Sequence, residues 1–390
     1  MMAPSVSFIL ATHNRREAVL NTLARIAECG LPESGYETIV VDNASTDGTA
    51  DAIERHFPET QVLRLRSNRG PCAKNAALPH AQGKYYVFLD DDSYPTAGSV
   101  VRMIWHFQRD PRLGAASFTV RLPDGQRECS AYPNVFIGCG VGFRRDAIRQ
   151  AGGLPDDFFM QAEEYDLSLR LLDRGWNVRT FDDIEVMHEK SPASRCSSQK
   201  MRLDVRNNLL VATRRFPSQY VEPYAKEWMT RYWAIAAASG RRLAAVRGFV
   251  EGSIKAVRPG SWSPVAEDTF ETFSRINETR RRMVQLQRQT GARRVLLIDW
   301  GKNLYAYRLA CEAAGLRIVG IADPKLAGQK YRGWTVCDDR SALQLDFDTA
   351  IVANLSPVHA AQRLREWRKL TPLPVIDLFE ESRAAVRVAA

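Results

Sequence analysis

The chain has 390 residues, of which 45% are hydrophobic and 25% are charged, and its formal net charge is +9. This is the composition of an ordinary globular protein, and the length suits about two or three domains. Its seven cysteines lack the spacing of a disulfide framework or a zinc site, so we expect a reducing compartment. No apolar run is long enough to cross a bilayer, which excludes a membrane-spanning segment.

The first residues enter a strand without the basic region of a signal peptide, so we expect a cytoplasmic protein. The positive charge is concentrated in residues 200–294, which contain 19 Lys and Arg against 8 Asp and Glu. Such a segment is either a solvated helical surface or a contact for an anionic partner. Nucleic acid is not expected, because the segment lacks the interleaved aromatic residues of a recognised module.

The first 190 residues alternate short β-branched runs with helical patterns. Strands are predicted at Val6–Ala11, Glu37–Asp42, Val62–Arg66 and Tyr85–Asp90, and helices at Arg15–Cys29, Thr49–His56 and Pro71–Ala81. After residue 92 we predict helices at Ser99–Arg109 and Glu163–Arg174 and strands at Ala115–Val120, Val135–Phe143, Val178–Phe181 and Ile184–His188. The alternation predicts an α/β domain with a mainly parallel sheet and helices on both faces.

From about residue 191 the pattern changes to long basic helices, interrupted at Pro259-Gly260-Ser261. A second α/β pattern follows Gly291. Its predicted strands are Val295–Asp299, Arg317–Ala322, Thr349–Ala353 and Val375–Leu378, with helices at Leu304–Ala314 and Val358–Lys369. We therefore predict three domains, at 1–195, 196–291 and 292–390.

Polar side chains follow the first two strands. Thr12, Asn14 and Arg15 come where a parallel sheet presents side chains to its ligand crevice, and an Arg that opens a helix can meet a phosphate. Thr and Asn also serve as N-caps, so both uses stay open. Asp42 ends the second strand, where it can accept hydrogen bonds from a base N–H or a ribose hydroxyl, whereas Asp47 caps the next helix.

A third polar segment runs from Asn68 to Ala77. Gly70 and Pro71 mark a loop that enters a helix near its first turn. Lys74 would lie one turn in, on the side nearest the crevice. A basic side chain there fits a nucleotide diphosphate, although a helical Lys is often only a solvated surface residue.

The strand Tyr85–Asp90 ends in three consecutive carboxylates, Asp90, Asp91 and Asp92. Adjacent carboxylates repel one another, a divalent cation would relieve the repulsion, and their hard oxygens suit Mg²⁺ or Mn²⁺. A cation at the carboxyl end of a central strand suits a nucleotide diphosphate in turn. The alternative, a solvated acidic loop, is disfavoured by the three polar segments that precede the cluster.

These segments, in this order and spacing, resemble the inverting family 2 glycosyltransferases of the GT-A fold, over roughly residues 6–191. The resemblance implies that Asp42 contacts the base of a nucleotide-sugar donor, Asp90 its ribose, and Asp92 a metal beside the diphosphate. Asp91 could share either role. Further donor contacts are implied for Thr12, Asn14, Arg15, Asn68, Gly70 and Lys74.

The resemblance continues downstream. Gly138 and Gly140 would face the acceptor, although small residues also let a strand pack tightly against a helix. In the pair Glu163 and Glu164 the second acid would be the general base, and Glu in place of the commoner Asp lengthens its reach by one methylene. Helix dipoles also favour acids in a first turn.

The resemblance implies that His188 approaches the metal from the opposite side of the diphosphate. Asp166 and Arg170, at i and i+4, are expected to brace the helix.

The implied function is transfer of a sugar, with inversion, from a nucleotide-diphosphate donor to a hydroxyl of a glycan or lipid-linked acceptor, with Mg²⁺ or Mn²⁺. Two alternatives stay open, a non-catalytic nucleotide-sugar-binding scaffold and a nucleotidyltransferase. As the anionic partner of the basic segment 200–294 we favour the inner face of an anionic membrane, or a lipid-diphosphate acceptor. A homo-oligomer stays open, and neither the sugar nor the acceptor can be read from the chain.

The C-terminal α/β pattern begins with Arg294-Val295-Leu296-Leu297-Ile298-Asp299-Trp300-Gly301, the strand and turn of a dinucleotide-binding start. It has one glycine where the fingerprint needs three, so we reject a functional NAD site. Gly320-Ile321-Ala322-Asp323-Pro324 and Gly333-Trp334-Thr335-Val336 loosely resemble the Rossmann-like domain that precedes hexapeptide-repeat sugar acyltransferases. Such a domain would hold a nucleotide-sugar, mediate assembly or brace the middle helices.

Overall fold

The computed structural model describes residues 4–32, 35–189, 197–258 and 262–381. The chain divides into two compact units, one made of 1–130 and 134–196, the other of 131–133 and 197–389. The predicted boundary at 195/196 and the break at 259–261 lie outside the described residues. The predicted domains 196–291 and 292–390 fall within the second unit, and the division between them stays a prediction.

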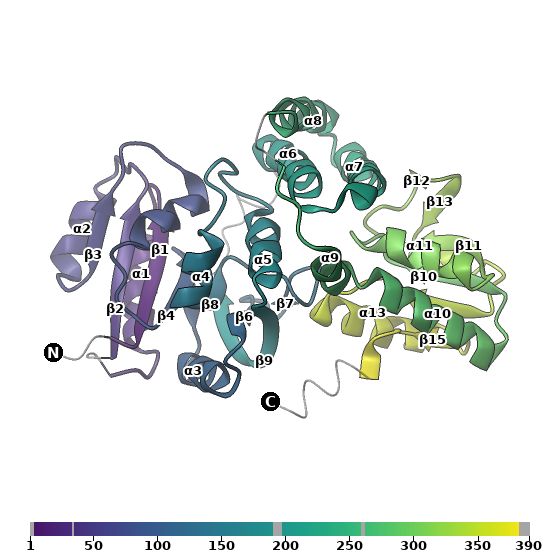
Figure 1. The fold of residues 1–390 in the computed structure, drawn as a ribbon, viewed down its shortest axis with the longest axis horizontal. Coiled ribbons are helices and arrows are strands. Elements are labelled where there is room, and N and C mark those ends of the chain that lie inside the picture. Colours follow the sequence, from purple (N-terminus) through teal and green to yellow (C-terminus); the bar gives the residue numbers. More distant parts are fainter. Residues whose placement is uncertain (1–3, 33–34, 190–196, 259–261, 382–390) are drawn as a thin grey trace. The chain divides into compact units, whose positions relative to one another are not determined.

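Within the described residues, the first unit is built on one nine-stranded sheet of order β3-β2-β1-β4-β8-β6-β9-β5, with β7 paired to β6 (Figure 1). The strands β1, β2, β3 and β4 are mutually parallel, whereas β8 runs antiparallel to β4 and β6. The strands are β1 Val6–Thr12, β2 Tyr36–Asp42, β3 Gln61–Arg64, β4 Tyr85–Asp90, β5 Ser93–Pro95, β6 Leu113–Arg121, β7 Arg127–Glu128, β8 Gly140–Arg144 and β9 Asn177–His188. The predicted α/β sheet is confirmed, with a parallel half and a mixed half.

Helices cover this sheet because their apolar residues recur at helical spacing. In α1, Val19, Leu23 and Ile26 are buried and pack in one cluster with Phe8 and Leu10 of β1. The helical elements of the unit are α1 Arg16–Ala27, α2 Thr49–His56, the 3-10 helix η2 Gly70–Ala77, α3 Ser99–Arg109, α4 Arg145–Ala151 and α5 Glu163–Asp173. The parallel strands β1, β2 and β4 end at the same edge of the sheet, where the candidate site lies.

Some predicted elements of the first unit differ in the structure. The two strands predicted at Val178–Phe181 and Ile184–His188 form one continuous strand, β9. The segment at 71–81 was predicted as an α-helix, but it is the shorter 3-10 helix η2. The predicted strand Val135–Phe143 begins only at Gly140. Residues 135–139 are apolar and include buried side chains, as a strand would, but the chain turns there, and the Gly138 carbonyl accepts a hydrogen bond from Lys74 instead of a strand partner.

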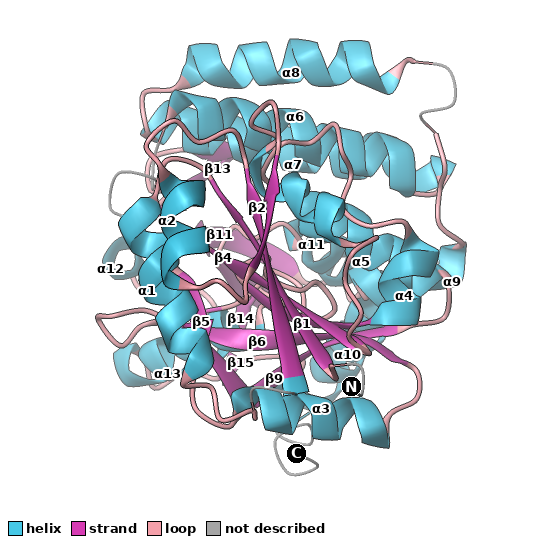
Figure 2. Ribbon diagram, turned by 90° about the vertical axis from the view of Figure 1, so that its left-hand side faces the viewer, coloured by secondary structure: helices cyan, strands magenta, loops and turns pink. Residues whose placement is uncertain are grey.

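The second unit combines helices with a six-stranded sheet of order β12-β13-β11-β10-β14-β15 among the described residues. Its helices are α6 Ser198–Arg215, α7 Ser218–Ala238, α8 Arg242–Ala256, α9 Glu267–Ser274, α10 Ile276–Thr290, α11 Leu304–Ala313, α12 Asp339–Ala342 and α13 Pro357–Leu370. Its strands are β10 Arg294–Ile298, β11 Arg317–Ala322, β12 Lys330–Tyr331, β13 Trp334–Cys337, β14 Thr349–Val352 and β15 Val375–Ile376. The helices α6 and α8 lie alongside each other (Figure 2).

The loop after β10, where a Rossmann-like sheet presents a ligand, is held by helix α7. Arg231 Nε donates to the carbonyl oxygen of Trp300 at 2.7 Å, and Trp228 Nε1 donates to that of Lys302 at 2.8 Å. These side chains occupy loop carbonyls at the carboxyl end of the strand. No helix in the described parts of the chain has both the length and the apolar composition to cross a membrane.

Candidate active site

The strand register brings the predicted donor residues to one edge of the sheet. Thr12 of β1 pairs with Asp42 of β2, and Ala11 pairs with Asp90 of β4. Because these strands are parallel, their carboxyl ends meet, and the acid cluster lies beside the first loop. The strand pairing therefore brings together residues that are 79 positions apart in the chain, Ala11 and Asp90.

Arg15 lies between the second and third acids of the cluster. Its Nη1 is 2.7 Å from Asp91 Oδ1, and its Nη2 is 2.7 Å from Asp92 Oδ2. Thr12 Oγ1 donates to the other oxygen of Asp91 at 2.8 Å. Both oxygens of Asp91 are thus held by Thr12 and Arg15, whereas Asp92 is held by Arg15 and by His188, whose Nε2 lies 3.2 Å from Asp92 Oδ1.

The acids of the cluster differ in charge behaviour because their neighbours differ. Burial raises the pKa of Asp91 to about 6, although Arg15 and Thr12 oppose the rise. Burial acts in the same direction on Asp92, but hydrogen bonds from His188 and Arg15 hold the pKa of Asp92 well below its usual range. Burial would lower the pKa of His188, yet its hydrogen bond to Asp92 raises that pKa to about 11.

Lys74 neutralises the first acid of the cluster. Its Nζ donates to Asp90 Oδ1 at 2.8 Å and to the carbonyl oxygen of Gly138 at 3.1 Å. The side chain is buried, because η2 carries it beneath the strand ends rather than into solvent. Lys74 is therefore not a solvated surface residue, the alternative that the sequence left open.

The loops around the cluster are held by their own polar residues. Asn14, with φ of +52°, accepts from the backbone N–H of Thr46 at 2.7 Å. Asn68 accepts from the N–H of Gly70 at 2.8 Å. A Cβ on Gly70 would lie 2.5 Å from the carbonyl oxygen of Phe159, and Gly70 has φ of +62°, so only glycine fits. In this structure these residues shape the loops that would receive a donor.

One carboxylate oxygen of Asp42 is buried without a hydrogen bond from the described residues. Its Oδ2 accepts from the N–H of Ser45 at 3.3 Å, while its buried Oδ1 has no hydrogen-bond partner among the described residues. A buried, unpaired acceptor is costly unless a ligand satisfies it. The adjacent Asn43, which the sequence reasoning missed, ties the loops together by accepting from Arg69 N at 3.0 Å and donating to Gly70 O at 2.9 Å.

Asp90, Cys139 and His188 each place one ligand atom within 4.8 Å of the others. His188 Nε2 is also 3.2 Å from Asp92 Oδ1, so the predicted pair of Asp92 and His188 does lie together. Carboxylate and imidazole ligands fit a divalent cation such as Mn²⁺, whereas a thiol is too soft a ligand for Mg²⁺. The sequence does not indicate Cys139 as a candidate metal ligand, because a single cysteine has no neighbouring ligand at a characteristic spacing.

The two glutamates open helix α5 after a strained loop. Phe159, Gln161 and Ala162 all have positive φ, which is costly for non-glycine residues and places the helix start. Glu163 is buried, and its Oε2 has no hydrogen-bond partner among the residues described. Burial, reinforced by the charge of Glu164, raises the pKa of Glu163 well above its ordinary value. Glu164 is half-buried.

Gly138 links the acid cluster to Glu164. A Cβ on Gly138 would lie 3.2 Å from Glu164 Oε1, so the two residues are neighbours. The Gly138 carbonyl accepts from Lys74, which in turn binds Asp90. Gly140 has a different neighbour, since a Cβ there would lie 2.6 Å from Val186 Cγ2, and strand packing alone accounts for a glycine at that position.

Asp166 and Arg170 brace helix α5, as predicted. Arg170 Nη2 is 2.7 Å from Asp166 Oδ2, and it also donates to the carbonyl oxygen of Gly153 at 2.6 Å. The pair thereby fixes the helix that carries Glu163 and Glu164 to the loop after α4.

Comparisons with known proteins agree with this geometry. Residues 7–155 match the model of glycosyl transferase family 2, and residues 123–216 match that of glycosyl transferase family group 2. The putative teichuronic acid biosynthesis glycosyltransferase TuaG of Bacillus subtilis is 37% identical over 155 residues, 35% of this chain and 60% of that protein. A poly-beta-1,6-N-acetyl-D-glucosamine synthase of Staphylococcus epidermidis is 30% identical over 142 residues, 34% of each chain. The matched segments thus cover less than two thirds of these relatives.

Among solved structures, TarS residues 1–349 of S. aureus in complex with UDP-GlcNAc align with a TM-score of 0.50 at 14% identity. The alignment covers 79% of this chain and 91% of that one. At this identity the likeness concerns the fold, which is the GT-A fold predicted for the first unit. The amino-terminal unit of this chain belongs to glycosyltransferase family 2 and has the GT-A fold.

Proposed function

We propose that the chain is an inverting glycosyltransferase that moves a sugar from a nucleotide-diphosphate donor to a hydroxyl of a glycan or lipid-linked acceptor. One observation carries the proposal, the connected series from Asp90 through Lys74 and Gly138 to Glu164. It joins an acid cluster suited to a donor to a carboxylate suited to deprotonate an acceptor. A sugar bound between them would lie against both.

Asp42 would bind the donor base, and Asp90 the ribose. The unpaired Oδ1 of Asp42 supports this assignment, because a base N–H or a hydroxyl would satisfy it. Asn14, Asn68 and Gly70 would contribute by holding the loops in shape. A structural neighbour, TarS, was solved with UDP-GlcNAc, which makes a nucleotide-sugar the natural first ligand to test.

Mg²⁺ or Mn²⁺ would be held by Asp92 and His188, with Asp90 within reach. Such a cation, when bound, neutralises the diphosphate and makes it a better leaving group. Arg15 would keep Asp92 charged and in place through its 2.7 Å contact. Lys74 would do the same for Asp90, so the acid cluster is set before any ligand arrives.

Glu164 would remove the proton of the acceptor hydroxyl, which then attacks the anomeric carbon from the face opposite the diphosphate. The bond to the diphosphate breaks in the same displacement, so the anomer inverts without a covalent enzyme intermediate. Burial, reinforced by the charge of Glu164, raises the pKa of Glu163, which favours the protonated form of the acid beside the base. Gly138 would leave room for the acceptor next to Glu164.

The test compares Glu164→Gln with the wild-type chain, using UDP-, GDP- and dTDP-sugars with Mg²⁺ or Mn²⁺. Slow donor hydrolysis by the wild-type chain would identify the donor without an acceptor. In Glu164→Gln we expect turnover to fall at least about a hundredfold, the usual contribution of a general base, while donor binding persists. Undiminished turnover would refute the assignment of the base, and binding without turnover in the wild-type chain would indicate a scaffold.

The acceptor and the location are proposed from the charge of the chain. We place the protein in the cytoplasm, at the inner face of the membrane, with the basic segment 200–294 toward anionic lipid. A lipid-linked acceptor would be presented at the same surface.

A further inference from the structure

Helix α8 packs on its neighbour through its smallest residues. Ala245, Gly248 and Gly252 are buried, and a Cβ on Gly248 would overlap the carbonyl oxygen of Arg202 in α6. A Cβ on Gly252 would lie 3.1 Å from the carbonyl oxygen of Arg206. The inward face is therefore a close contact between backbones, with no place for large apolar side chains.

The large apolar residues of α8 lie on its outer side. Their exposed fractions range from 44% to 82%, and they are Leu243, Val246, Phe249, Val250, Ile254 and Val257, just after the helix end. At about 100° per residue, all but Phe249 fall within an arc of roughly 80°, opposite the buried glycines. A helix that packs on a protein core normally turns its large apolar residues inward and its polar residues outward. The outer face of α8 therefore suits an apolar environment outside the chain.

Basic residues border the apolar arc on both sides. Arg242 lies at one margin, and Arg247 and Arg258 lie at the other, and all three are exposed. The one acid of α8, Glu251, is bound by Arg202 at 2.9 Å. The helix thus offers apolar side chains flanked by cations, which is the pattern of a helix that lies in the interface of an anionic bilayer.

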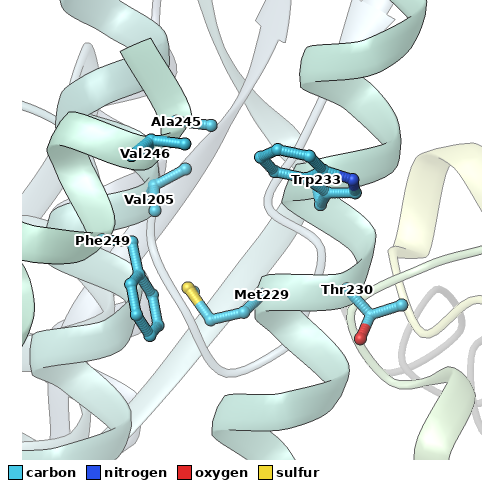
Figure 3. Close-up of a pocket in the computed structure, with 7 residues that line it drawn as sticks. All are labelled: Val205, Met229, Thr230, Trp233, Ala245, Val246 and Phe249. Carbon is cyan, nitrogen blue, oxygen red and sulfur yellow. The ribbon is translucent and has the colours of Figure 1, made fainter. Parts of the chain in front are cut away.

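An apolar recess adjoins this face. It has a volume of about 350 Å³, and Met229 and Trp233 of α7 face Val246 and Phe249 of α8 across it (Figure 3). Trp233 is itself 48% exposed. An aromatic ring with a polar N–H at the edge of an apolar surface suits the headgroup level of a membrane.

We propose that the outer face of α8, with the adjoining recess, inserts into the headgroup and upper acyl region of an anionic bilayer. A second copy of the chain is the other apolar partner to consider. A two-fold contact through this narrow face would bring the arginines at its margins near those of the other copy, and like charges oppose it. An anionic bilayer instead buries the apolar side chains of the arc and attracts the arginines at its margins. The inference rests on the proposed membrane location, which it assigns to one face of one helix, and it is independent of the proposed reaction.

The experiment is co-sedimentation of the full chain with phosphatidylcholine vesicles, with and without phosphatidylglycerol. We expect binding to the anionic vesicles, and a loss of at least about tenfold in the partition coefficient for Val250→Asp and Ile254→Asp, which place a charge in the apolar arc. Arg247→Glu should also weaken binding. Raising the salt to about 1 M, where the Debye length is about 3 Å, should remove the contribution of the arginines.

Matched controls come from the same unit. Leu370, 47% exposed at the end of α13, is changed to Asp, and the exposed Arg365 of that helix is changed to Glu. Both controls should bind vesicles as the wild-type chain does, and circular dichroism verifies the fold of each variant. Equal losses in the controls, or equal binding to neutral vesicles, would overturn the proposal. So would a dimer in sedimentation velocity that Val250→Asp dissociates, if vesicles are not bound.

Discussion

Lys74 is 1% exposed and places its ammonium 2.8 Å from the Asp90 carboxylate. Removing one partner of such a pair leaves the other charge without compensation. We expect Lys74→Met to lower the free energy of unfolding by about 3 kcal/mol, at the low end for such pairs because about a third of the Asp90 side chain is exposed. Urea unfolding measures the loss. The exposed Lys84→Met is the control and should change stability by less than about 0.5 kcal/mol.

Asp91 and Asp92 should respond differently to the same substitution. Both oxygens of Asp91 are held by Thr12 and Arg15, whereas Asp92 also reaches His188. We expect Asp92→Asn to weaken Mn²⁺ binding at least about tenfold. Asp91→Asn should leave the Mn²⁺ affinity nearly unchanged and lower stability by about 1–3 kcal/mol. Titration of the free Mn²⁺ signal by electron paramagnetic resonance separates the two, and equal losses of affinity would contradict these roles.

The buried carboxyl of Glu163 should make the protein less stable as the pH rises. Burial, together with the charge of Glu164, raises the pKa of Glu163 in the folded state above the ordinary value of 4.5. The folded state then holds a proton that the unfolded state releases, so stability falls as the pH rises from 4.5 toward the folded-state pKa, by at most about 1.4 kcal/mol per pH unit. Glu163→Gln should flatten this slope in unfolding free energies measured from pH 5 to 8. The same slope in both proteins would show that Glu163 is not the cause.

Alanine at the two predicted acceptor-side glycines should have different effects. At Gly138 the added Cβ would lie 3.2 Å from Glu164 Oε1, so the carboxylate must move by a few tenths of an ångström. We expect turnover to fall about tenfold with little loss of stability. At Gly140 the Cβ would lie 2.6 Å from Val186 Cγ2 within a packed sheet, and stability should fall by about 1–3 kcal/mol. Thermal unfolding and donor hydrolysis, measured on both variants, test the contrast.

The sequence predicts correctly the bounds of those helices and strands that are ended by neighbouring residues in the chain. The strand Tyr85–Asp90 and the helices Thr49–His56 and Ser99–Arg109 have the predicted bounds. Each is bounded by residues that cannot continue it or that favour a turn, such as Gly48 and Gly98, both with positive φ. The position of the acid cluster at a strand end followed directly from these bounds.

The contacts that could not be predicted are those between side chains and partners that lie far away in the sequence. Nothing near Lys74 indicates that its ammonium is buried against Asp90 and the Gly138 carbonyl. The sequence predicts that a metal relieves the repulsion between the carboxylates, but three basic side chains already contact the cluster, namely Arg15, Lys74 and His188. The net charge of residues 200–294 does not indicate the apolar outer face of α8.

The contact between Gly70 and the carbonyl of Phe159 has a consequence for the exchange of segments between relatives. Asn75 binds the backbone of Leu154 through both of its amide atoms, and Arg69 pairs with Asp156 at 2.8 Å. The segments 68–77 and 153–159 are therefore complementary surfaces, fitted to each other atom by atom. A chimera that takes one segment from a relative must take the other as well, so donor preference and the placement of the base would be inherited together.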